Sequence, residues 1–267
     1  MTKHIIFPGP GKCGTSYIYS LALKYLDKDT FNFPRIKESN YLTSHTSFEL
    51  NKYLKFYSSQ DPTKWFLDFS NTYFFSSRFS SALRNLSDFR MYITLRDPVE
   101  RVYSHLHQYA LSYNYSSLDQ ALDNHLDVLS RSLYSKQLYK FSDYKDRISF
   151  ILLNDLKLNP LAVISNIAKE AGSMITCEEF SSDSLNQNAR KSSRFPAFTR
   201  ISRSLYAQFK NISPSAAASL KSSRTISHIL YSKSPSSLPS SVGLDSYIRN
   251  YFTEEYSFLK SYYGITF

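Results

Sequence analysis

Apolar residues along the chain follow two alternating patterns. Short apolar runs, typical of buried strands, lie at 5–7, 33–36, 65–69, 91–95 and 148–154. Between these runs, apolar residues recur at intervals of three and four, as they do on one face of a helix. Strands that alternate with helices in a chain of 267 residues predict a single α/β domain spanning residues 1–267.

The same pattern predicts the helical and irregular segments. Helices are expected after Gly14, at 46–58, in two pieces across 117–145, up to a C-cap at Gly172, and at about 244–263. Between about 211 and 241, 12 of 31 residues are serine and three are proline. This composition predicts an irregular segment in place of another domain.

The first predicted strand runs into a glycine-rich loop. Residues 8–11 end the apolar run, and helical spacing begins after Gly14. The N-terminus of that helix turns free N–H groups and the positive end of its dipole toward the loop. Lys12, Thr15 and Ser16 add a cation and two hydroxyls. The loop is therefore expected to bind a phosphate or a sulfate.

The position of the lysine separates this loop from that of the nucleotide triphosphatases. Their loop reads G-x-x-x-x-G-K-[ST], with the lysine after the last glycine. Here Lys12 precedes Gly14. The order argues against a kinase or an ATPase, and a purely structural strand-to-helix turn is the other alternative.

A second strand-to-helix junction carries charged residues in a regular pattern. Asp97 is a good N-cap, Pro98 suits the first helical position, and Glu100 completes a capping box. Arg96 at the strand end and Ser104, about two turns into the helix, are expected on the same side of the junction. A capped helix with a structural Arg-Asp pair is the alternative interpretation.

Composition narrows the class of protein further. The formal charge of +10 attracts anions, and nucleic acid, acidic glycans and a highly charged nucleotide all fit it. Two cysteines cannot form a disulfide scaffold and suit a reducing compartment. No apolar stretch approaches the roughly 18 residues of a membrane span, and the run at 5–7 is too short for a signal peptide. We expect a cytoplasmic chain with no transmembrane span and no bound metal ion.

Taken together, the two junctions resemble the donor site of sulfotransferases that use 3′-phosphoadenosine 5′-phosphosulfate (PAPS). The stretch 10–16 is similar to the P-K-C/S-G-T-T/S loop of that family, with Gly11 inserted, and 95–104 resembles its L-R-D-P-x-x-R-x-x-S motif. The resemblance implies the P-loop-like fold of that family, a mainly parallel sheet flanked by helices. It implies PAPS as the co-substrate, with Arg96 and Ser104 at its 3′-phosphate and Arg101 as a brace. At its 5′-phosphosulfate it implies Lys12, Cys13, Gly14, Thr15, Ser16 and Tyr17.

Three further segments resemble parts of the same family, and the first of them resembles its carbohydrate or heparan-sulfate branch. The segment 37–41 is similar to K-E-x-x-Y/F, which implies that Glu38 is the general base, and a carboxylate beside a lysine can accept a hydroxyl proton. The segment 132–139 resembles G-x-Y-x-x-Q-L, which implies that Tyr134 lines the nucleotide pocket. The basic stretch 186–194 implies Arg190 as a donor contact. Core packing is the alternative for Tyr134, and a solvated charge is the alternative for Arg190.

Other candidates for the base fit the family less well. His105 and His107 lie beside Ser104, but cytosolic sulfotransferases carry their histidine base upstream, near the strand at 65–69, where this chain has none. The strand itself matches the family loosely, with Asp68 and Ser70 at positions where an acidic or basic residue is usual. Glu38 is therefore the preferred base.

The resemblance implies an enzyme that transfers the sulfuryl group of PAPS to an acceptor hydroxyl, with a carbohydrate favoured. Glu38 would deprotonate the acceptor, and Lys12 would stabilise the leaving 3′,5′-adenosine diphosphate. The expected partner is a glycan or a glycosylated molecule, and nucleic acid is not expected. A tyrosine or a small alcohol is not excluded as the acceptor. The alternatives are a kinase or ATP-binding P-loop protein, and a noncatalytic basic binder of nucleic acid or another polyanion.

Overall fold

The chain packs as two compact units. The computed structural model describes residues 2–44, 48–176, 191–193, 206, 212–214, 231–233 and 238–267. The first unit, which we call the sheet unit, comprises Met1–Arg96 and Lys140–Asn188, and the second, the helical unit, comprises Asp97–Tyr139 and Ala189–Phe267. The single domain over 1–267 stays a prediction. No helix in the described part of the chain has the length and apolar character needed to cross a lipid bilayer.

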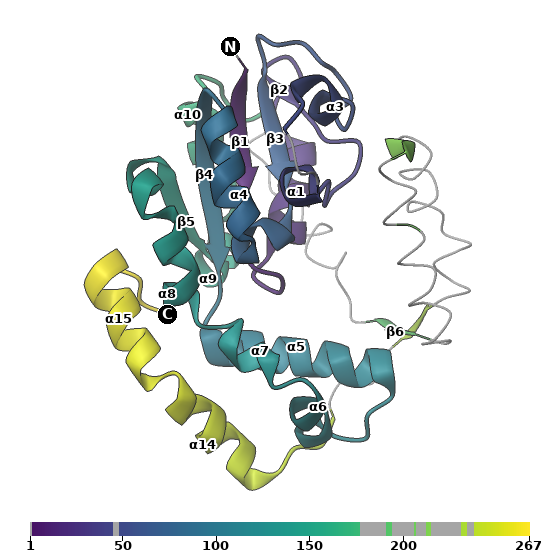
Figure 1. Ribbon diagram of the computed structural model, residues 1–267, viewed down its shortest axis with the longest axis vertical. Coiled ribbons are helices and arrows are strands. Elements are labelled where there is room, and N and C mark those ends of the chain that lie inside the picture. Colours follow the sequence, from purple (N-terminus) through teal and green to yellow (C-terminus); the bar gives the residue numbers. More distant parts are fainter. Residues whose placement is uncertain are drawn as a thin grey trace. The chain divides into compact units, whose positions relative to one another are not determined.

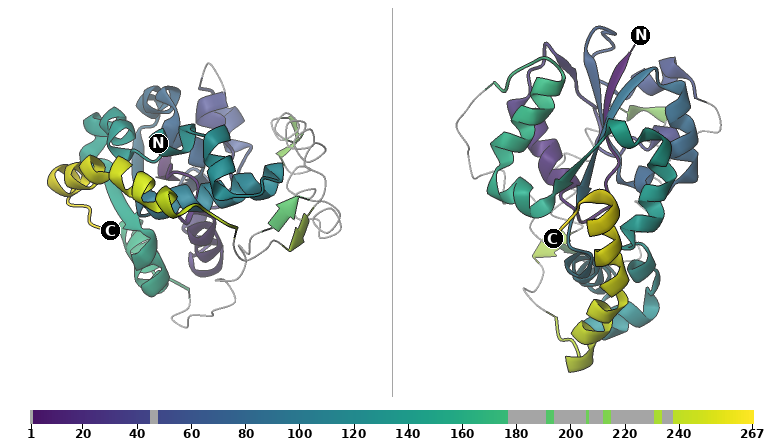
Figure 2. Two further views of the ribbon diagram at one scale, coloured as in Figure 1. Left: turned by 90° about the horizontal axis from the view of Figure 1, so that it is seen from below. Right: turned by 90° about the vertical axis from the view of Figure 1, so that its left-hand side faces the viewer.

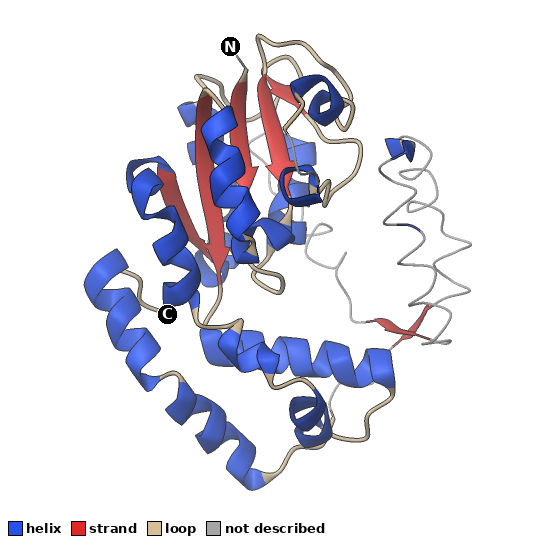
Figure 3. Cartoon of the chain, viewed as in Figure 1, coloured by secondary structure: helices blue, strands red, loops and turns tan. Residues whose placement is uncertain are grey.

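A five-stranded parallel sheet forms the centre of the sheet unit (Figure 1 and Figure 3). The strand order is β2-β3-β1-β4-β5, and all neighbouring strands run parallel. Parallel strands need crossover connections over the faces of the sheet, and helices cover both faces here (Figure 2). The prediction of a mainly parallel sheet flanked by helices is confirmed. The strands are β1 (Lys3–Phe7), β2 (Phe31–Asn32), β3 (Trp65–Phe69), β4 (Asp88–Leu95) and β5 (Ile148–Leu152).

Helices and 3-10 turns connect these strands. In chain order they are α1 (Thr15–Tyr25), α2 (Tyr41–Ser44), α3 (Leu50–Leu54), η1 (Asn71–Phe75), α4 (Ser77–Ala82), η2 (Leu83–Asn85), η3 (Tyr139–Arg147), α9 (Leu153–Leu158) and α10 (Pro160–Glu170). As predicted, Gly172 follows the end of α10, and its φ of 73° favours glycine.

Alternating side chains on β1 and β3 divide the packing of the sheet unit between two faces. Phe7 and Phe69 stack at 4.2 Å between ring centroids and belong to the cluster that α1 and α10 complete. His4 and Phe66 lie on the opposite face, where the His4 ring is 5.7 Å from the ring of Tyr53 in α3. Both faces are therefore buried, and a polar side chain on either face of β3 needs a partner within the protein.

Three predicted elements differ from the structure. The strand at 33–36 is wrong, because pairing with β3 occurs earlier, at Phe31–Asn32, and Pro34 has no N–H to continue a ladder. The helix at 46–58 is shorter, at Leu50–Leu54, and 45–47 lie outside the described residues. The strand at 148–154 ends at Leu152, because Leu153 begins α9.

The helical unit is built on α5. Val102 and Leu106 of this helix pack in one cluster with Leu244 and Ile248 from the C-terminal segment. The predicted helix at about 244–263 is two helices that meet at Phe252, and Gly264 follows the second with a φ of 65°. Much of the predicted irregular segment at 211–241 lies outside the described residues. The elements are α5 (Pro98–Tyr113), α6 (Leu118–Asn124), α7 (Asp127–Ser130), α8 (Tyr134–Leu138), β6 (Lys191–Ser193), β7 (Tyr231–Lys233), α14 (Val242–Tyr251) and α15 (Thr253–Tyr263).

Asp97 caps α5, as the sequence predicts. Its Oδ1 accepts a hydrogen bond from the Glu100 N–H (2.9 Å), and its Oδ2 accepts one from the Tyr256 hydroxyl (2.6 Å). One turn on, the fully buried Arg101 donates to the Arg131 carbonyl (3.0 Å). Arg101 therefore acts as a structural brace within the helical unit, as expected.

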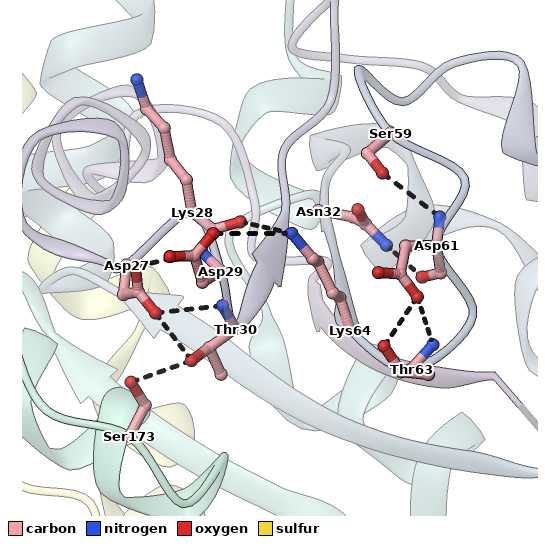
Figure 4. A network of polar contacts seen from close by, with 10 residues as sticks. All are labelled: Asp27, Lys28, Asp29, Thr30, Asn32, Ser59, Asp61, Thr63, Lys64 and Ser173. Carbon is pink, nitrogen blue, oxygen red and sulfur yellow. Dashed lines mark hydrogen bonds and ion pairs between the residues drawn. The ribbon is translucent and has the colours of Figure 1, made fainter.

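A polar network fastens the turns at the amino ends of β2 and β3 (Figure 4). Asp27 accepts hydrogen bonds from the Asp29 N–H (3.0 Å) and from the Thr30 hydroxyl (2.9 Å). Across the turn, Lys64 donates to the Lys28 carbonyl (2.9 Å). The hydrogen bonds to Asp29 and Thr30 lower the pKa of Asp27. These hydrogen bonds hold the two turns in place at this end of the sheet.

His4 gives the sheet unit a defined response to acid. Its side chain is fully buried, and burial lowers its pKa from 6.5 to about 4. The His4 imidazole therefore binds a proton near pH 6.5 in the unfolded chain but only near pH 4 in the folded chain. The contribution of His4 to the free energy of unfolding is fully present above pH 6.5. It is lost as the pH drops toward 4, by about 3 kcal/mol in total.

We predict that His4→Phe removes this part of the acid sensitivity, because phenylalanine keeps the ring contacts with Phe66 and Tyr53 and does not titrate. Urea unfolding at pH 7 and pH 5 measures the effect. The free energy of unfolding should fall less between the two pH values in the variant than in the native chain. An equal fall in both proteins would show that His4 does not contribute.

Candidate functional site

Three neighbouring strands of the sheet unit, β3, β1 and β4, point their carboxyl ends toward the same edge, although β4 continues to Leu95, past the last residue paired with β1. Phe7 of β1 is in register with Phe69 of β3, and Ile6 is in register with Met91 of β4. The loop after β1, the turn after β3 and Arg96 after β4 therefore leave from the same edge, which we call the carboxyl edge. Open parallel sheets bind their ligands at this edge.

The glycine loop at 8–14 is packed closely against the sheet unit. A Cβ atom on Gly9 would lie 2.3 Å from Thr94 Oγ1 and 2.8 Å from the Thr94 backbone nitrogen. A Cβ atom on Gly14 would lie 2.7 Å from Leu153 Cδ1, and Gly14 has a φ of 91°. Glycine at both positions lets the loop run this close to β4 and α9.

Helix α1 presents its N-terminus to this loop without a compensating acid. Gly14 precedes the helix in a left-handed conformation, no side chain caps it, and no acidic residue lies in its first turn. Lys12 lies two residues earlier with a φ of 75°. The helix dipole and the ammonium group together create positive potential at the loop, which suits a phosphate or a sulfate.

The other predicted loop residues differ in exposure. Cys13 is fully buried and Thr15 is nearly so, whereas Lys12 and Ser16 are partly exposed. Lys12 and Ser16 are therefore loop side chains that a ligand can reach. The donor contacts predicted for Cys13, Gly14, Thr15 and Tyr17 stay predictions.

Two buried hydroxyls beside the loop have no hydrogen-bond partner among the described residues. They are Tyr17 Oη, on the first turn of α1, and Thr94 Oγ1, under Gly9. Burial also raises the pKa of Tyr17. A buried hydroxyl without a partner costs about 1–3 kcal/mol. The motif comparison did not identify Thr94, although a threonine at the end of an apolar strand is the signal that could have found it.

Glu38 lies at the end of β3, although it comes from an earlier segment of the chain. Its N–H donates to the Phe69 carbonyl (2.9 Å), and its Oε2 accepts from the Asn71 N–H (2.8 Å). Lys37 forms an ion pair with Oε1, and the two side chains are 12% and 22% exposed. Because β3 and β1 are paired neighbours, Glu38 and the glycine loop share the carboxyl edge.

A buried carboxylate lies behind Glu38. Asp68 of β3 accepts hydrogen bonds from the hydroxyls of Tyr73 (2.8 Å), Ser70 (2.8 Å) and Tyr53 (2.9 Å). Burial raises the pKa of Asp68, and these hydrogen bonds act in the opposite direction. Sequence comparison gave Asp68 no role. An acid inside the apolar stretch 65–69 was nevertheless a signal, because aspartate is seldom fully buried unless its carboxylate has partners.

The other predicted site residues lie in different parts of the chain. Arg96 follows β4 at the carboxyl edge of the sheet unit, whereas Ser104 lies on α5 of the helical unit, partly exposed. Tyr134 begins α8, is fully buried, and has its ring 6.3 Å from that of Phe267, a placement typical of a packing residue. Arg190 lies outside the described residues. The donor contacts predicted for these four residues stay predictions.

The two histidines that the sequence offers as alternative bases lie on α5. His105 stacks on Tyr109 at 5.6 Å between ring centroids, and His107 is partly exposed. Among the described residues, no three His, Cys, Asp or Glu side chains are grouped so that they could hold a metal ion. In the sheet unit, Glu38 is the predicted base that lies at the carboxyl edge.

Comparison with solved structures finds this fold among sulfotransferases. A sulfotransferase from Alicyclobacillus acidocaldarius matches with a TM-score of 0.54 and 17% identity, over 82% of this chain and 94% of that chain. A sulfotransferase domain from the olefin synthase of Synechococcus PCC 7002 matches with a TM-score of 0.44 and 15% identity, over 96% and 95%. No protein-family model and no curated protein matches the chain. The first likeness shows that the chain has the α/β fold of a sulfotransferase.

We predict that Gly9→Ala destabilises the protein by about 1–3 kcal/mol, because its Cβ would overlap Thr94. Gly243→Ala is the matched control, since a Cβ there meets nothing within 4 Å. In that helix alanine should be neutral or stabilising by up to about 1 kcal/mol. Urea unfolding of both variants measures the difference, and equal stability of Gly9→Ala and the native chain would contradict this packing.

Proposed function

We propose that this chain transfers the sulfuryl group of PAPS to a hydroxyl of an acceptor, and that a carbohydrate is the favoured acceptor class. The observation that carries the proposal is the shared edge of the sheet. There the glycine loop with Lys12 follows β1, Arg96 follows β4, and Glu38 is hydrogen-bonded at the end of β3. The loop supplies an anion site, Glu38 supplies a base, and Arg96 supplies a second cation.

The proposed chemistry gives each of these residues one task. Glu38 takes the proton of the acceptor hydroxyl while the acceptor oxygen bonds to sulfur, and the bond from sulfur to the 5′-phosphate oxygen breaks. Lys12 and the N-terminus of α1 stabilise the negative charge that develops on the departing phosphate. Arg96 holds the 3′-phosphate through its planar donors. Placement and charge stabilisation supply most of the catalysis, as in phosphoryl transfer.

Charge favours an acidic acceptor. The chain carries a formal charge of +10, which attracts a polyanionic glycan and accelerates its association at low salt. The Lys37-Glu38 ion pair supports a hydroxyl acceptor, because a carboxylate can take the proton of a hydroxyl. We therefore propose an acidic glycan as the first acceptor to test, ahead of a neutral sugar, a tyrosine or a small alcohol.

The rival function, a kinase or an ATPase, differs in a measurable way. Phosphoryl transfer from ATP needs Mg²⁺, whereas the proposed sulfuryl transfer uses the chain's own cations. Transfer of ³⁵S from PAPS to heparosan or to chitotriose should continue in excess EDTA. Transfer of ³²P from ATP that EDTA abolishes would replace the proposal by the rival.

We predict that Glu38→Gln lowers kcat for ³⁵S transfer by about 10²–10⁴, because the amide cannot take the acceptor proton. The KM for PAPS should stay within about twofold, because the variant removes no positive charge from the donor loop. Glu49→Gln is the matched control, since it also removes a glutamate that pairs with a lysine, at an exposed position. Unchanged transfer by Glu38→Gln would exclude Glu38 as the base.

A further inference from the structure

The segment that carries Glu38 has an unfavourable backbone conformation. Glu38 has a φ of 69° and Asn40 has a φ of 54°, and both values lie in the left-handed region. For glutamate this region costs about 1–2 kcal/mol, whereas asparagine adopts it more readily. The Glu38 conformation persists only where surrounding contacts hold it. The contacts that hold this segment therefore decide where the Glu38 carboxylate lies.

Some of these contacts come from the chain that follows β3. The Glu38 N–H reaches the Phe69 carbonyl, and the Asn71 N–H reaches Glu38 Oε2. These two hydrogen bonds hold the backbone and the carboxylate of Glu38. The N–H groups of the next residues still need hydrogen-bond acceptors. Those groups open α2, a single turn of helix whose first amides have no partner within the helix.

Buried hydroxyls bind these amides. Ser70 Oγ accepts from the Asn40 N–H (3.1 Å), and Tyr73 Oη accepts from the Leu42 N–H (3.3 Å). The same two hydroxyls donate to Asp68, at 2.8 Å each. Because each hydroxyl has a single proton, donation to Asp68 leaves its lone pairs available to the amides.

Ser39, the neighbour of Glu38, connects directly to the same carboxylate. Its Oγ lies 3.3 Å from both oxygens of Asp68 and 3.4 Å from the Tyr41 nitrogen, which donates to it. We call Asp68, Ser39, Ser70, Tyr73 and Tyr53 the Asp68 cluster. Three consecutive amides, those of residues 40, 41 and 42, are thus bound by hydroxyls that Asp68 orients.

A neutral acceptor could not replace the carboxylate. Asp68 accepts from up to four hydroxyls at once, whereas an amide side chain in its place has one acceptor oxygen and a nitrogen that only donates. Burying a carboxylate costs several kcal/mol in the absence of such donors. An apolar residue would be the simpler way to fill a site between buried aromatic rings, so stability alone does not account for Asp68.

We propose that Asp68 is a positioning residue for the base: through Ser39, Ser70 and Tyr73 it holds the 38–42 segment so that the Glu38 carboxylate faces the acceptor hydroxyl. This inference rests on the proposed function. Asp68 is buried beneath its hydroxyl partners, so its effect on the reaction passes through Glu38. Loss of one relay hydroxyl should therefore loosen the segment and slow the proton transfer, with no effect on donor binding.

Ser70→Ala and Tyr57→Phe form a matched pair for the test. Both remove one buried hydroxyl from the same face of β3. Ser70 connects Asp68 to the Asn40 amide, whereas Tyr57 Oη donates to Tyr53 Oη (2.7 Å) and makes no described contact with the 38–42 segment. A merely structural role would lower the free energy of unfolding similarly in both variants and would not separate their kinetics.

We expect Ser70→Ala to lower kcat about tenfold with the KM for PAPS unchanged, and Tyr57→Phe to leave both unchanged. Combining Ser70→Ala with Glu38→Gln should lower the residual rate less than twofold further, because the two residues act on the same step. A full tenfold effect in the Glu38→Gln background, or an equal effect of Tyr57→Phe, would overturn the inference.

Amide hydrogen exchange on peptides spanning residues 37–44 separates this inference from the proposed function. Exchange should be at least tenfold faster in Ser70→Ala than in Tyr57→Phe, and this readout needs no turnover. If the native chain transfers no sulfuryl group to heparosan or chitotriose, the proposed function fails while the exchange result still decides whether the Asp68 cluster holds Glu38. Equal exchange in the two variants would overturn the inference, even in an active enzyme.

Discussion

The parallel pairing of β1 with both β3 and β4 is the constraint on which the rest of the site depends. It turns the carboxyl ends of three parallel strands toward one edge of the sheet, where a loop, a turn and an arginine follow them. It also brings the glycine loop so close to Thr94 that no side chain fits on Gly9. The short connection from β1 to α1 then points the helix N-terminus along the same edge. Strand pairing, rather than any single charged residue, places the candidate groups together.

The glycine loop carries positive charge at this edge, whereas the end of β3 carries two carboxylates and the lysine that pairs with Glu38. The positive potential comes from Lys12 and from the N-terminus of α1, which has no acidic residue in its first turn. The negative charges lie on the β3 side, where backbone N–H groups and hydroxyls bind Glu38 and Asp68. Local donors therefore satisfy each carboxylate.

Local sequence patterns predicted the elements whose limits depend on nearby residues. The strand at 65–69 and the start of α5 after Asp97 were predicted correctly, because an apolar run and a capping residue act over a few positions. The strand at 33–36 was misplaced, because the pairing that defines β2 joins Phe31 to Trp65, 34 residues further along the chain, and Pro34 limits the ladder. The break at Phe252 was missed, since the apolar periodicity continues through it.

The sequence predicted some residues of the candidate site and missed others. Lys12 and Glu38 came from motifs that resemble a known family, and the structure places both at the carboxyl edge. Asp68 was only a loose match to an acidic or basic position of that family, and Thr94 matched no motif. Their significance depends on burial and on partners such as Tyr73 and Gly9, which the order of residues along the chain does not reveal.

Calorimetric titration of the chain with 3′,5′-adenosine diphosphate and with ADP, for the native protein and for Arg96→Ala, tests for a PAPS site at the carboxyl edge. Such a site should give micromolar binding of 3′,5′-adenosine diphosphate alone, lost in the variant, because Arg96 would hold the 3′-phosphate that ADP lacks. Equal binding of both nucleotides, or of neither, would contradict a PAPS site at the carboxyl edge.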